Sequence, residues 1–189
     1  VIAYFISTID ILTFDTVVRE WIYSLRSDHL TLFFRSVTYL GNWQTVTVIC
    51  IVVLAARPNR WSPGIPMASA AIIAVLLQKL LKASFHRTRP DISLHLIQQG
   101  GFSFPSGHSF TVLVFYGMVI YLCRLTIKNR MAANAITILL SILIFFIGFS
   151  RIYLGVHFPT DVLGGWSLGL CLLMVLITGY QTFLSRFHL

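Results

Sequence analysis

The chain has 189 residues, of which 57% are hydrophobic and 11% are charged, and its mean hydropathy is +0.82. Because a water-soluble domain averages about 25% charged residues, this composition excludes an ordinary soluble domain and indicates an integral membrane protein. The formal net charge of +8 does not indicate nucleic-acid binding, since basic residues flank apolar segments and no basic stripe is interleaved with aromatic residues. We predict a single membrane-embedded domain over residues 1–189. Its expected partner is the lipid bilayer, and nucleic acid is not expected to bind.

The first predicted elements are a truncated membrane helix and an amphipathic helix. Residues 1–14 are apolar but short for a span of about 20 residues, which predicts a first helix truncated at the N-terminus. From Phe14 to Leu25, apolar residues that include Ile22 recur at three- and four-residue intervals, with Asp15 and other charged residues opposite. This pattern is typical of a helix lying in the membrane interface, although an ordinary bundle helix has the same pattern.

Five longer apolar segments follow and predict five further membrane helices. They cover residues 30–56, 65–84, 105–126, 131–150 and 161–183. The last of them contains Gly165 and Gly169 in a GxxxG spacing, which permits close helix packing. The predicted fold class is therefore all-α: a polytopic membrane protein with a six-transmembrane-helix bundle and an interfacial amphipathic helix.

Three polar clusters interrupt the apolar segments. They are Lys82–Pro90 (KASFHRTRP), Pro105–Ser109 (PSGHS) and Ser150–Asp161 (SRIYLGVHFPTD). The two helices between the second and third clusters each span roughly 28 Å, so the chain returns to its starting depth and all three clusters are expected on one membrane face. The turns at 57–64 and 124–130 are purely cationic, which favours the cytoplasm for the turns and the extracytoplasmic face for the clusters.

Three cations in these clusters indicate an anion site. Lys82, Arg89 and Arg151 bring positive charges to a place where the nearby acids are Asp91 and Asp161. Such an excess calls for an anion, and the forked guanidinium groups together with an ammonium match the oxygens of a phosphate. Alone, each cation has an ordinary explanation, because a lysine near a helix end commonly extends toward the membrane surface.

Two histidines and a helix start add to this candidate site. The helix that opens with Ser106, Gly107 and His108 presents backbone N–H groups to an anion, and Gly107 lets a ligand approach the backbone. His157 and Asp161 are four residues apart, so the carboxylate can hold one imidazole nitrogen and leave the other available as a nucleophile. His108 can serve as the acid for the leaving oxygen. Taken singly, a capped helix start and a helical ion pair explain these residues, and their combination on one face favours the phosphate site.

The spacing of these residues resembles the three-part signature of the phosphatidic acid phosphatase type 2 superfamily, in its membrane-bound lipid phosphatase branch. The matching segments are Lys82-x6-Arg89-Pro90, Pro105-Ser106-Gly107-His108 and Ser150-Arg151-x5-His157-x3-Asp161. Every fixed position of the signature is filled, in order, within residues 82–161. The six-helix plan of the membrane members also fits the rest of the chain.

The resemblance implies a phosphatase that acts on a membrane lipid phosphate without a metal or other cofactor. His157 would attack phosphorus to form a phosphohistidine, Asp161 would orient it, and His108 would protonate the leaving group. The phosphoryl oxygens would be held by Lys82, Arg89, Ser106, Gly107 and Arg151. The sequence itself contains no HExxH motif, carboxylate cluster or cysteine set that would hold a metal.

The motifs leave the lipid open, because an isoprenoid diphosphate such as undecaprenyl diphosphate, phosphatidylglycerol phosphate and phosphatidic acid all fit. One alternative enzyme is a lipid phosphotransferase with the same pocket, and another is a vanadate-dependent haloperoxidase, against which the membrane spans argue. A non-catalytic anion-binding or transport membrane protein is an alternative from a different class. We also consider that His86 and Arg87, which lie between motif residues, touch the outer groups of the substrate.

Overall fold

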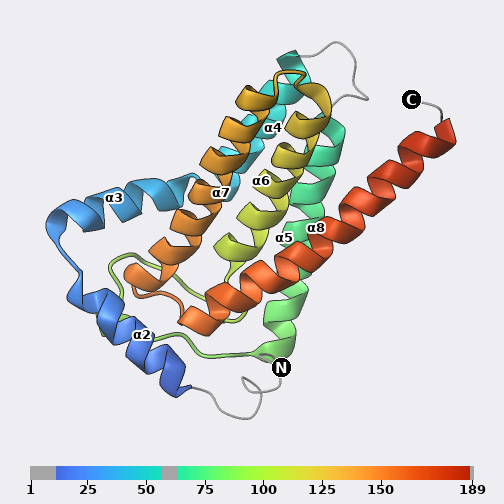
Figure 1. The fold of residues 1–189 in the computed structure, drawn as a ribbon. Helices are drawn as coiled ribbons and strands as arrows, with labels where there is room; N and C mark the ends of the chain where they lie inside the picture. The colour runs from blue at the N-terminus through green and yellow to red at the C-terminus, as the bar shows by residue number, and fades with distance from the viewer. Residues whose placement is uncertain (1–11, 57–63, 188–189) are drawn as a thin grey trace.

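The computed structural model describes residues 12–56 and 64–187, and over these residues the chain is helical and forms no β-strand (Figure 1). The helices are α2 (Thr13–Ser24), α3 (Asp28–Tyr39), α4 (Trp43–Ala56), α5 (Gly64–Phe85), α6 (Gly107–Thr126), α7 (Arg130–Tyr153) and α8 (Pro159–Phe187), with a short 3-10 helix, η1 (Ile92–Leu94), between α5 and α6. Helix α6 is the central one of the bundle, because it packs against α5, α7 and α8.

Four of these helices, α5 to α8, are long and apolar enough to cross a membrane. Helices α3 and α4 form a bent pair that supplies a fifth crossing if the pair is one span. The all-helical membrane class is thus confirmed, whereas six spans are not. The additional span predicted over residues 1–14 lies almost entirely outside the described part of the chain.

The prediction of one continuous helix over residues 30–56 was wrong. The segment forms two helices, α3 and α4, whose axes differ by 47°. Gly41 lies at the break, where a Cβ atom would come within 2.8 Å of the Ile147 side chain of α7. The Tyr116 hydroxyl of α6 donates to the Leu40 carbonyl at 2.8 Å and so satisfies an acceptor at the end of α3. These contacts come from other helices, so the apolar character of the segment does not reveal the break.

Helix α2 lies across the ends of α7 and α8 (Figure 1). On its outer side, Val17 and Trp21 are each 61% exposed, which fits the predicted interfacial helix. Ile22, predicted on that outer side, is instead buried in a cluster with Tyr153 of α7. Asp15, on the inner side, is completely buried. The inner side of α2 is therefore part of the protein interior.

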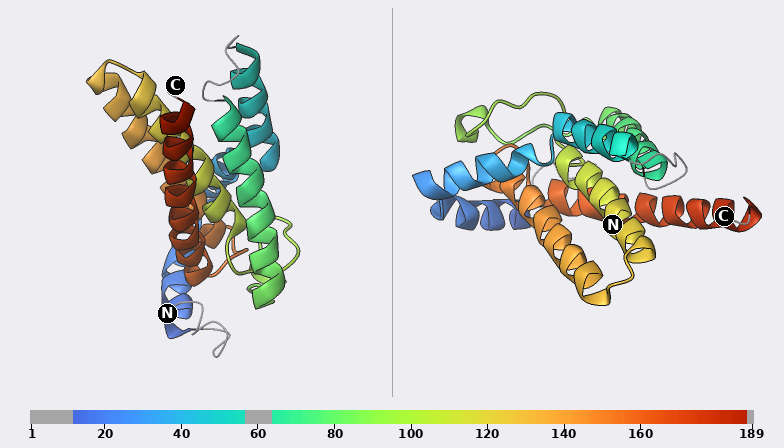
Figure 2. Two further views of the ribbon diagram at one scale, coloured as in Figure 1. Left: turned by 90° about the vertical axis from the view of Figure 1, so that its right-hand side faces the viewer. Right: turned by 90° about the horizontal axis from the view of Figure 1, so that it is seen from above.

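The two glycines of the GxxxG spacing fix the start of α8 against the start of α6. A Cβ atom on Gly165 would lie 2.8 Å from the Ser106 carbonyl oxygen, and one on Gly169 would lie 3.0 Å from that of Phe110. The predicted close packing is therefore confirmed. At the same end of the bundle lie the C-terminal ends of α5 and α7 (Figures 1 and 2). The three polar clusters meet at this end, as the helix lengths predicted.

Candidate active site

Backbone carbonyls of the loop between α5 and α6 and of the turn between α7 and α8 hold two of the predicted cations beside His157. Arg89 donates from Nε to the Gly101 carbonyl at 2.8 Å and from Nη1 to the Val156 carbonyl at 2.6 Å. Lys82, in the last turn of α5, donates to the Phe102 carbonyl. Carbonyl oxygens orient these cations without cancelling their charge. Burial lowers the pKa of Arg89 to about 10, so its guanidinium is still charged at pH 7.

His157 lies in the turn between α7 and α8, which Gly155 makes possible. Gly155 has a φ of +83°, and a Cβ atom there would meet the Leu94 carbonyl oxygen at 2.1 Å, so no other residue fits without a shift. His157 Nδ1 lies 3.4 Å from Asp161 Oδ2, and its Nε2 lies 3.1 Å from Arg89 Nη1. Burial, and then the positive charge of Arg89, lowers the pKa of His157 well below its usual value. The imidazole is therefore neutral at pH 7.

Asp161, in the first turn of α8, is held on both carboxylate oxygens. Its Oδ2 accepts hydrogen bonds from the Phe158 backbone N–H at 2.8 Å and from the Ser103 hydroxyl at 2.5 Å, besides facing His157. Its Oδ1 accepts from Arg87 Nη1 at 2.6 Å. These hydrogen bonds on both oxygens hold the carboxylate with Oδ2 toward the imidazole.

Arg87 links this carboxylate to a second one, on α2. Its Nη2 donates to Asp15 Oδ2 at 2.7 Å, and the side chains of both ion pairs, with Asp15 and with Asp161, are completely buried. Thr160 joins the two residues of the first pair, because its N–H and hydroxyl donate to the Asp15 carboxylate and its hydroxyl accepts from Arg87 Nη1 at 2.8 Å. The hypothesis that Arg87 touches the outer groups of the substrate was therefore wrong: Arg87 is buried behind Asp161.

His108 and Gly107 lie at the start of α6, as predicted. His108 Nε2 is 2.9 Å from the Asn42 side-chain oxygen, which comes from the break between α3 and α4. Ser106 is the N-cap, and its hydroxyl accepts from the Ser109 backbone N–H. A Cβ atom on Gly107 would lie 2.5 Å from Gln78 Oε1, so the close approach that Gly107 permits is to a side chain of α5.

Arg151, the third predicted cation, lies behind the other two. It is 1% exposed, and it donates to Thr38 Oγ1 at 2.8 Å and to Gln99 Oε1 at 2.7 Å. Its Nε is buried and has no hydrogen-bond partner among the described residues. Neither Arg151 nor Ser106 lines the cavity described next. Of the five predicted phosphate-binding residues, Lys82, Arg89 and Gly107 line the cavity, whereas Arg151 and Ser106 lie behind the residues that line it.

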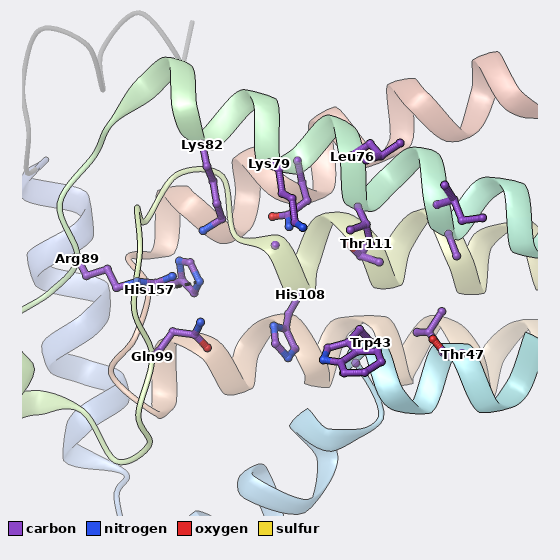
Figure 3. A pocket seen from close by; sticks show the side chains of 17 residues that line it. Trp43, Thr47, Leu76, Lys79, Lys82, Arg89, Gln99, His108, Thr111 and His157 are labelled. Atoms are coloured by element: carbon purple, nitrogen blue, oxygen red, sulfur yellow. Dashed lines mark hydrogen bonds between the residues drawn. The ribbon is translucent and has the colours of Figure 1, made fainter.

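A cavity of about 600 Å³ lies between α4, α5 and α6, and most of the predicted site residues line it (Figure 3). Its polar end is lined by Lys82, Arg89, Gln99, Gly107, His108 and His157, and its other end by Gly41, Trp43, Val46, Thr47, Ala71, Ile72, Val75, Leu76 and Thr111, with Gln78 and Lys79 between. The second end is mostly apolar, so the cavity suits a ligand with an anionic head and an apolar tail. In the described ranges 12–56 and 64–187, no three His, Cys, Asp or Glu side chains are grouped as metal ligands would be.

Sequence reasoning missed several residues of this site and gave Arg87 a different role. Asp15 and Arg87 form the buried ion pairs, and Asn42 and Gln99 hold His108 and Arg151. The signal in the sequence was Asp15 itself, which the residue pattern places on the polar face of the amphipathic helix, opposite the apolar residues. Contacts between residues 72 positions apart, as for Asp15 and Arg87, leave no local pattern.

Comparison with known proteins assigns the family. The family model described as the PAP2 superfamily matches residues 63–185, which is more than half of the chain and includes all three motifs. The chain belongs to the PAP2 superfamily. Its resemblance to that family, first suggested by the motif spacing, is thus confirmed.

Two curated relatives and one solved structure describe what this PAP2 chain is similar to. Phosphatidylglycerophosphatase B of Bacillus subtilis (strain 168) is 33% identical over 169 residues, which are 87% of this chain and 81% of that protein. Undecaprenyl-diphosphatase of Sulfolobus acidocaldarius is 31% identical over 132 residues, 67% of this chain and 58% of that one. The crystal structure of the PAP2-type phosphatidylglycerolphosphate phosphatase from Bacillus subtilis has a TM-score of 0.85 at 30% identity and covers 98% of this chain and 93% of that chain.

Proposed function

We propose that this PAP2 chain is an integral-membrane lipid phosphatase that hydrolyses a phosphomonoester or diphosphate of a membrane lipid through a phosphohistidine intermediate. The observation that carries the proposal is the setting of His157, whose Nδ1 faces Asp161 while its Nε2 faces Arg89 and the cationic end of the cavity. The relatives are lipid phosphatases by name, and the apolar end of the cavity has room for a lipid tail, which supports a lipid substrate.

In the proposed mechanism, neutral His157 attacks phosphorus through Nε2, and the bond from phosphorus to the lipid oxygen breaks. Asp161 stabilises the positive charge that then forms on the ring, through Nδ1–H. His108 protonates the leaving oxygen and later accepts a proton from the water that hydrolyses the phosphohistidine. The products are inorganic phosphate and the lipid with one phosphoryl group fewer: the free alcohol from a phosphomonoester, or the lipid monophosphate from a diphosphate. Phosphoryl transfer depends mainly on positioning and charge stabilisation, which this site is equipped to provide.

The phosphoryl oxygens would be bound in two layers. Lys82 and Arg89 contact them directly, together with the backbone N–H groups at Gly107. Arg151 joins when the phosphate displaces the Gln99 amide from its Nη2, and Ser106 holds the start of α6 in place through its cap. Because the cations supply the charge that a metal would otherwise bring, we propose that the reaction needs no metal ion.

Phosphate release from a panel of lipids tests this function. Purified protein in detergent is expected to release inorganic phosphate from undecaprenyl diphosphate, phosphatidylglycerol phosphate or phosphatidic acid, in excess chelator, and to be inhibited by vanadate, which takes the five-coordinate geometry of the reaction. Transfer of the phosphate to a second lipid without release would identify a phosphotransferase. Absence of any turnover on the whole panel would leave an anion-binding or transport protein, and activity that needs an added divalent metal would contradict the metal-free mechanism.

We further propose that the site faces the extracytoplasmic side and that residues 1–189 form a single membrane-embedded domain. The cationic turn after α6 supports this orientation. A cysteine in place of Gln98, which is exposed beside the site, is expected to react with an impermeant thiol reagent in intact cells. A cysteine in place of Lys128, exposed in the turn between α6 and α7, is expected not to react. The reverse pattern would invert the orientation.

A further inference from the structure

Lys79 is a cation of α5 that the phosphate site described above does not use. It lies within the candidate span Gly64–Phe85, it is exposed, and it lines the cavity. No hydrogen bond or ion pair joins its side chain to another residue of the described ranges. A charge inside a membrane helix is costly and is retained mainly where it faces a polar cavity or a ligand.

The position of Lys79 along the cavity identifies which part of a ligand it would meet. Lys79 precedes Lys82 by one helical turn, so their Cβ atoms are about 5–6 Å apart on one side of α5. In Figure 3, Lys82, Lys79 and Leu76 follow one another along α5, from the end with His157 toward the apolar end. A lipid whose cleaved phosphate lies at Lys82 and whose tail lies along Leu76 therefore has its connecting group at Lys79.

Gln78 brings a second polar group to the same stretch of the cavity. Its Oε1 packs against Gly107 and is buried without a hydrogen-bond partner among the described residues. No protein group fixes the amide through that oxygen, so the NH2 end can turn to donate to an acceptor in the cavity. An ammonium and an amide side by side match the oxygens of an anion.

We propose that Lys79 and Gln78 bind a second phosphoryl group, on the tail side of the one that is cleaved, and that the chain therefore prefers lipid diphosphates to lipid monophosphates. This inference rests on the proposed lipid phosphatase function and specifies its substrate class. Because Lys79 and Lys82 are one helical turn apart, they suit two phosphoryl groups that share a bridging oxygen. Phosphatidylglycerol phosphate also carries two phosphoryl groups, but they are farther apart.

The second subsite would also act on the reaction. When His157 Nε2 bonds to the terminal phosphorus, the bond from that phosphorus to the bridging oxygen breaks, and the bridging oxygen leaves on the lipid monophosphate with an added negative charge. Lys79 lies where this charge develops and stabilises it. Water then hydrolyses the phosphohistidine to inorganic phosphate. Lys79 thus favours both binding and departure of a diphosphate.

Two matched substrate pairs test the subsite: farnesyl diphosphate against farnesyl monophosphate, and phosphatidylglycerol phosphate against phosphatidic acid. Lys79→Met is expected to lower kcat/KM for farnesyl diphosphate by about 10- to 100-fold, the value of a charge-assisted hydrogen bond, with a smaller loss on the monophosphate. Lys79→Arg should restore most of the difference. Lys128→Met, which removes a charge at the far end of the bundle, is the control and should change neither.

The outcomes separate the subsite from the function on which it rests. A selective loss on the farnesyl pair supports the subsite and its preference for diphosphates. A selective loss only on the phosphatidyl pair supports a second phosphoryl site of longer reach and overturns the preference for diphosphates. Equal losses on all four lipids, or none, in a protein that hydrolyses them would overturn the subsite, because a lysine that only extends toward the membrane surface is indifferent to the number of phosphoryl groups. A wild-type protein that hydrolyses none of the four instead refutes the proposed function.

Discussion

The two sides of the His157 ring differ in how their charges are satisfied. On the rear side, which consists of Asp15, Arg87 and Asp161, each charge is completely buried and paired with an opposite one. On the cavity side, which consists of Lys79, Lys82 and Arg89, no carboxylate contacts any of the three cations within the described residues. The rear side is complete within the protein, whereas the cavity side reaches charge balance only with an anionic ligand.

The three charges of the rear side sum to a net negative charge, which acts on His157. If Arg87 faced Asp161 alone, the pair would be neutral and would do little to stabilise a positive imidazole. Asp15 adds a second carboxylate, so two carboxylates and one guanidinium leave one net negative charge behind His157. We therefore regard Asp15 and Arg87 as positioning residues for the catalytic pair, and the following predictions separate the contributions of the two sides.

The largest loss of activity is expected when the imidazole of His157 is removed. His157→Ala removes the proposed nucleophile and should lower kcat by about 10⁴-fold or more on every substrate. His108→Ala should still form the phosphoenzyme from p-nitrophenyl phosphate, because nitrophenol leaves without protonation. Rapid-quench measurement should therefore show a nitrophenol burst and an acid-labile phosphoenzyme in His108→Ala and neither in His157→Ala. His29→Ala, at an exposed position on α3, is the control, and equal losses in both site variants on all substrates would contradict the assigned roles.

A smaller effect is expected on the rear side. Asp15→Asn keeps the shape of the side chain but removes the second negative charge, so kcat should fall by about 10- to 100-fold while KM changes little. Arg26→Gln is the matched control, because Arg26 also fastens α2, through the carbonyls of Tyr153 and Leu94, without touching Asp161. If Arg26→Gln lowers kcat as much as Asp15→Asn does, the role of Asp15 is only to attach α2.

The contrast between the two sides also explains what the sequence could predict. Lys82, Arg89 and the two histidines of the site were found because polar residues in apolar segments stand out, and helix lengths alone predicted that their clusters lie at one end of the bundle. Lys79 was not singled out. Asp15 was assigned only to the polar face of an amphipathic helix, since nothing local distinguishes a charge that faces solvent from one that faces Arg87. The break at Gly41 was also missed, and there the chain packs closely against Ile147, a residue far away in the sequence.

The smallest expected effect is a pH dependence of the free energy of unfolding, which follows from the lowered pKa of His157. Burial, followed by the charges of the cavity side, lowers the pKa of His157 well below its usual value. The unfolded chain has an ordinary histidine pKa of about 6.5. Between the two values the unfolded state binds more protons, so the free energy of unfolding should decrease as the pH falls below about 6.5. Above that pH the ring is neutral in both states and contributes no pH dependence.

The same shift should be visible in kinetics. The nucleophile must be neutral, so the acid limb of kcat/KM for p-nitrophenyl phosphate, corrected for ionisation of the substrate, should lie well below pH 6.5. Arg89→Gln removes the charge that contributes most to the shift after burial, so the limb should move to higher pH, in addition to the loss of activity from weaker phosphate binding. Lys128→Gln, far from the ring, should leave the limb in place. A wild-type limb at pH 6.5 or above, or one that Arg89→Gln does not move, would mean that the charges of the cavity side do not act on His157, and the two sides would then be electrostatically independent.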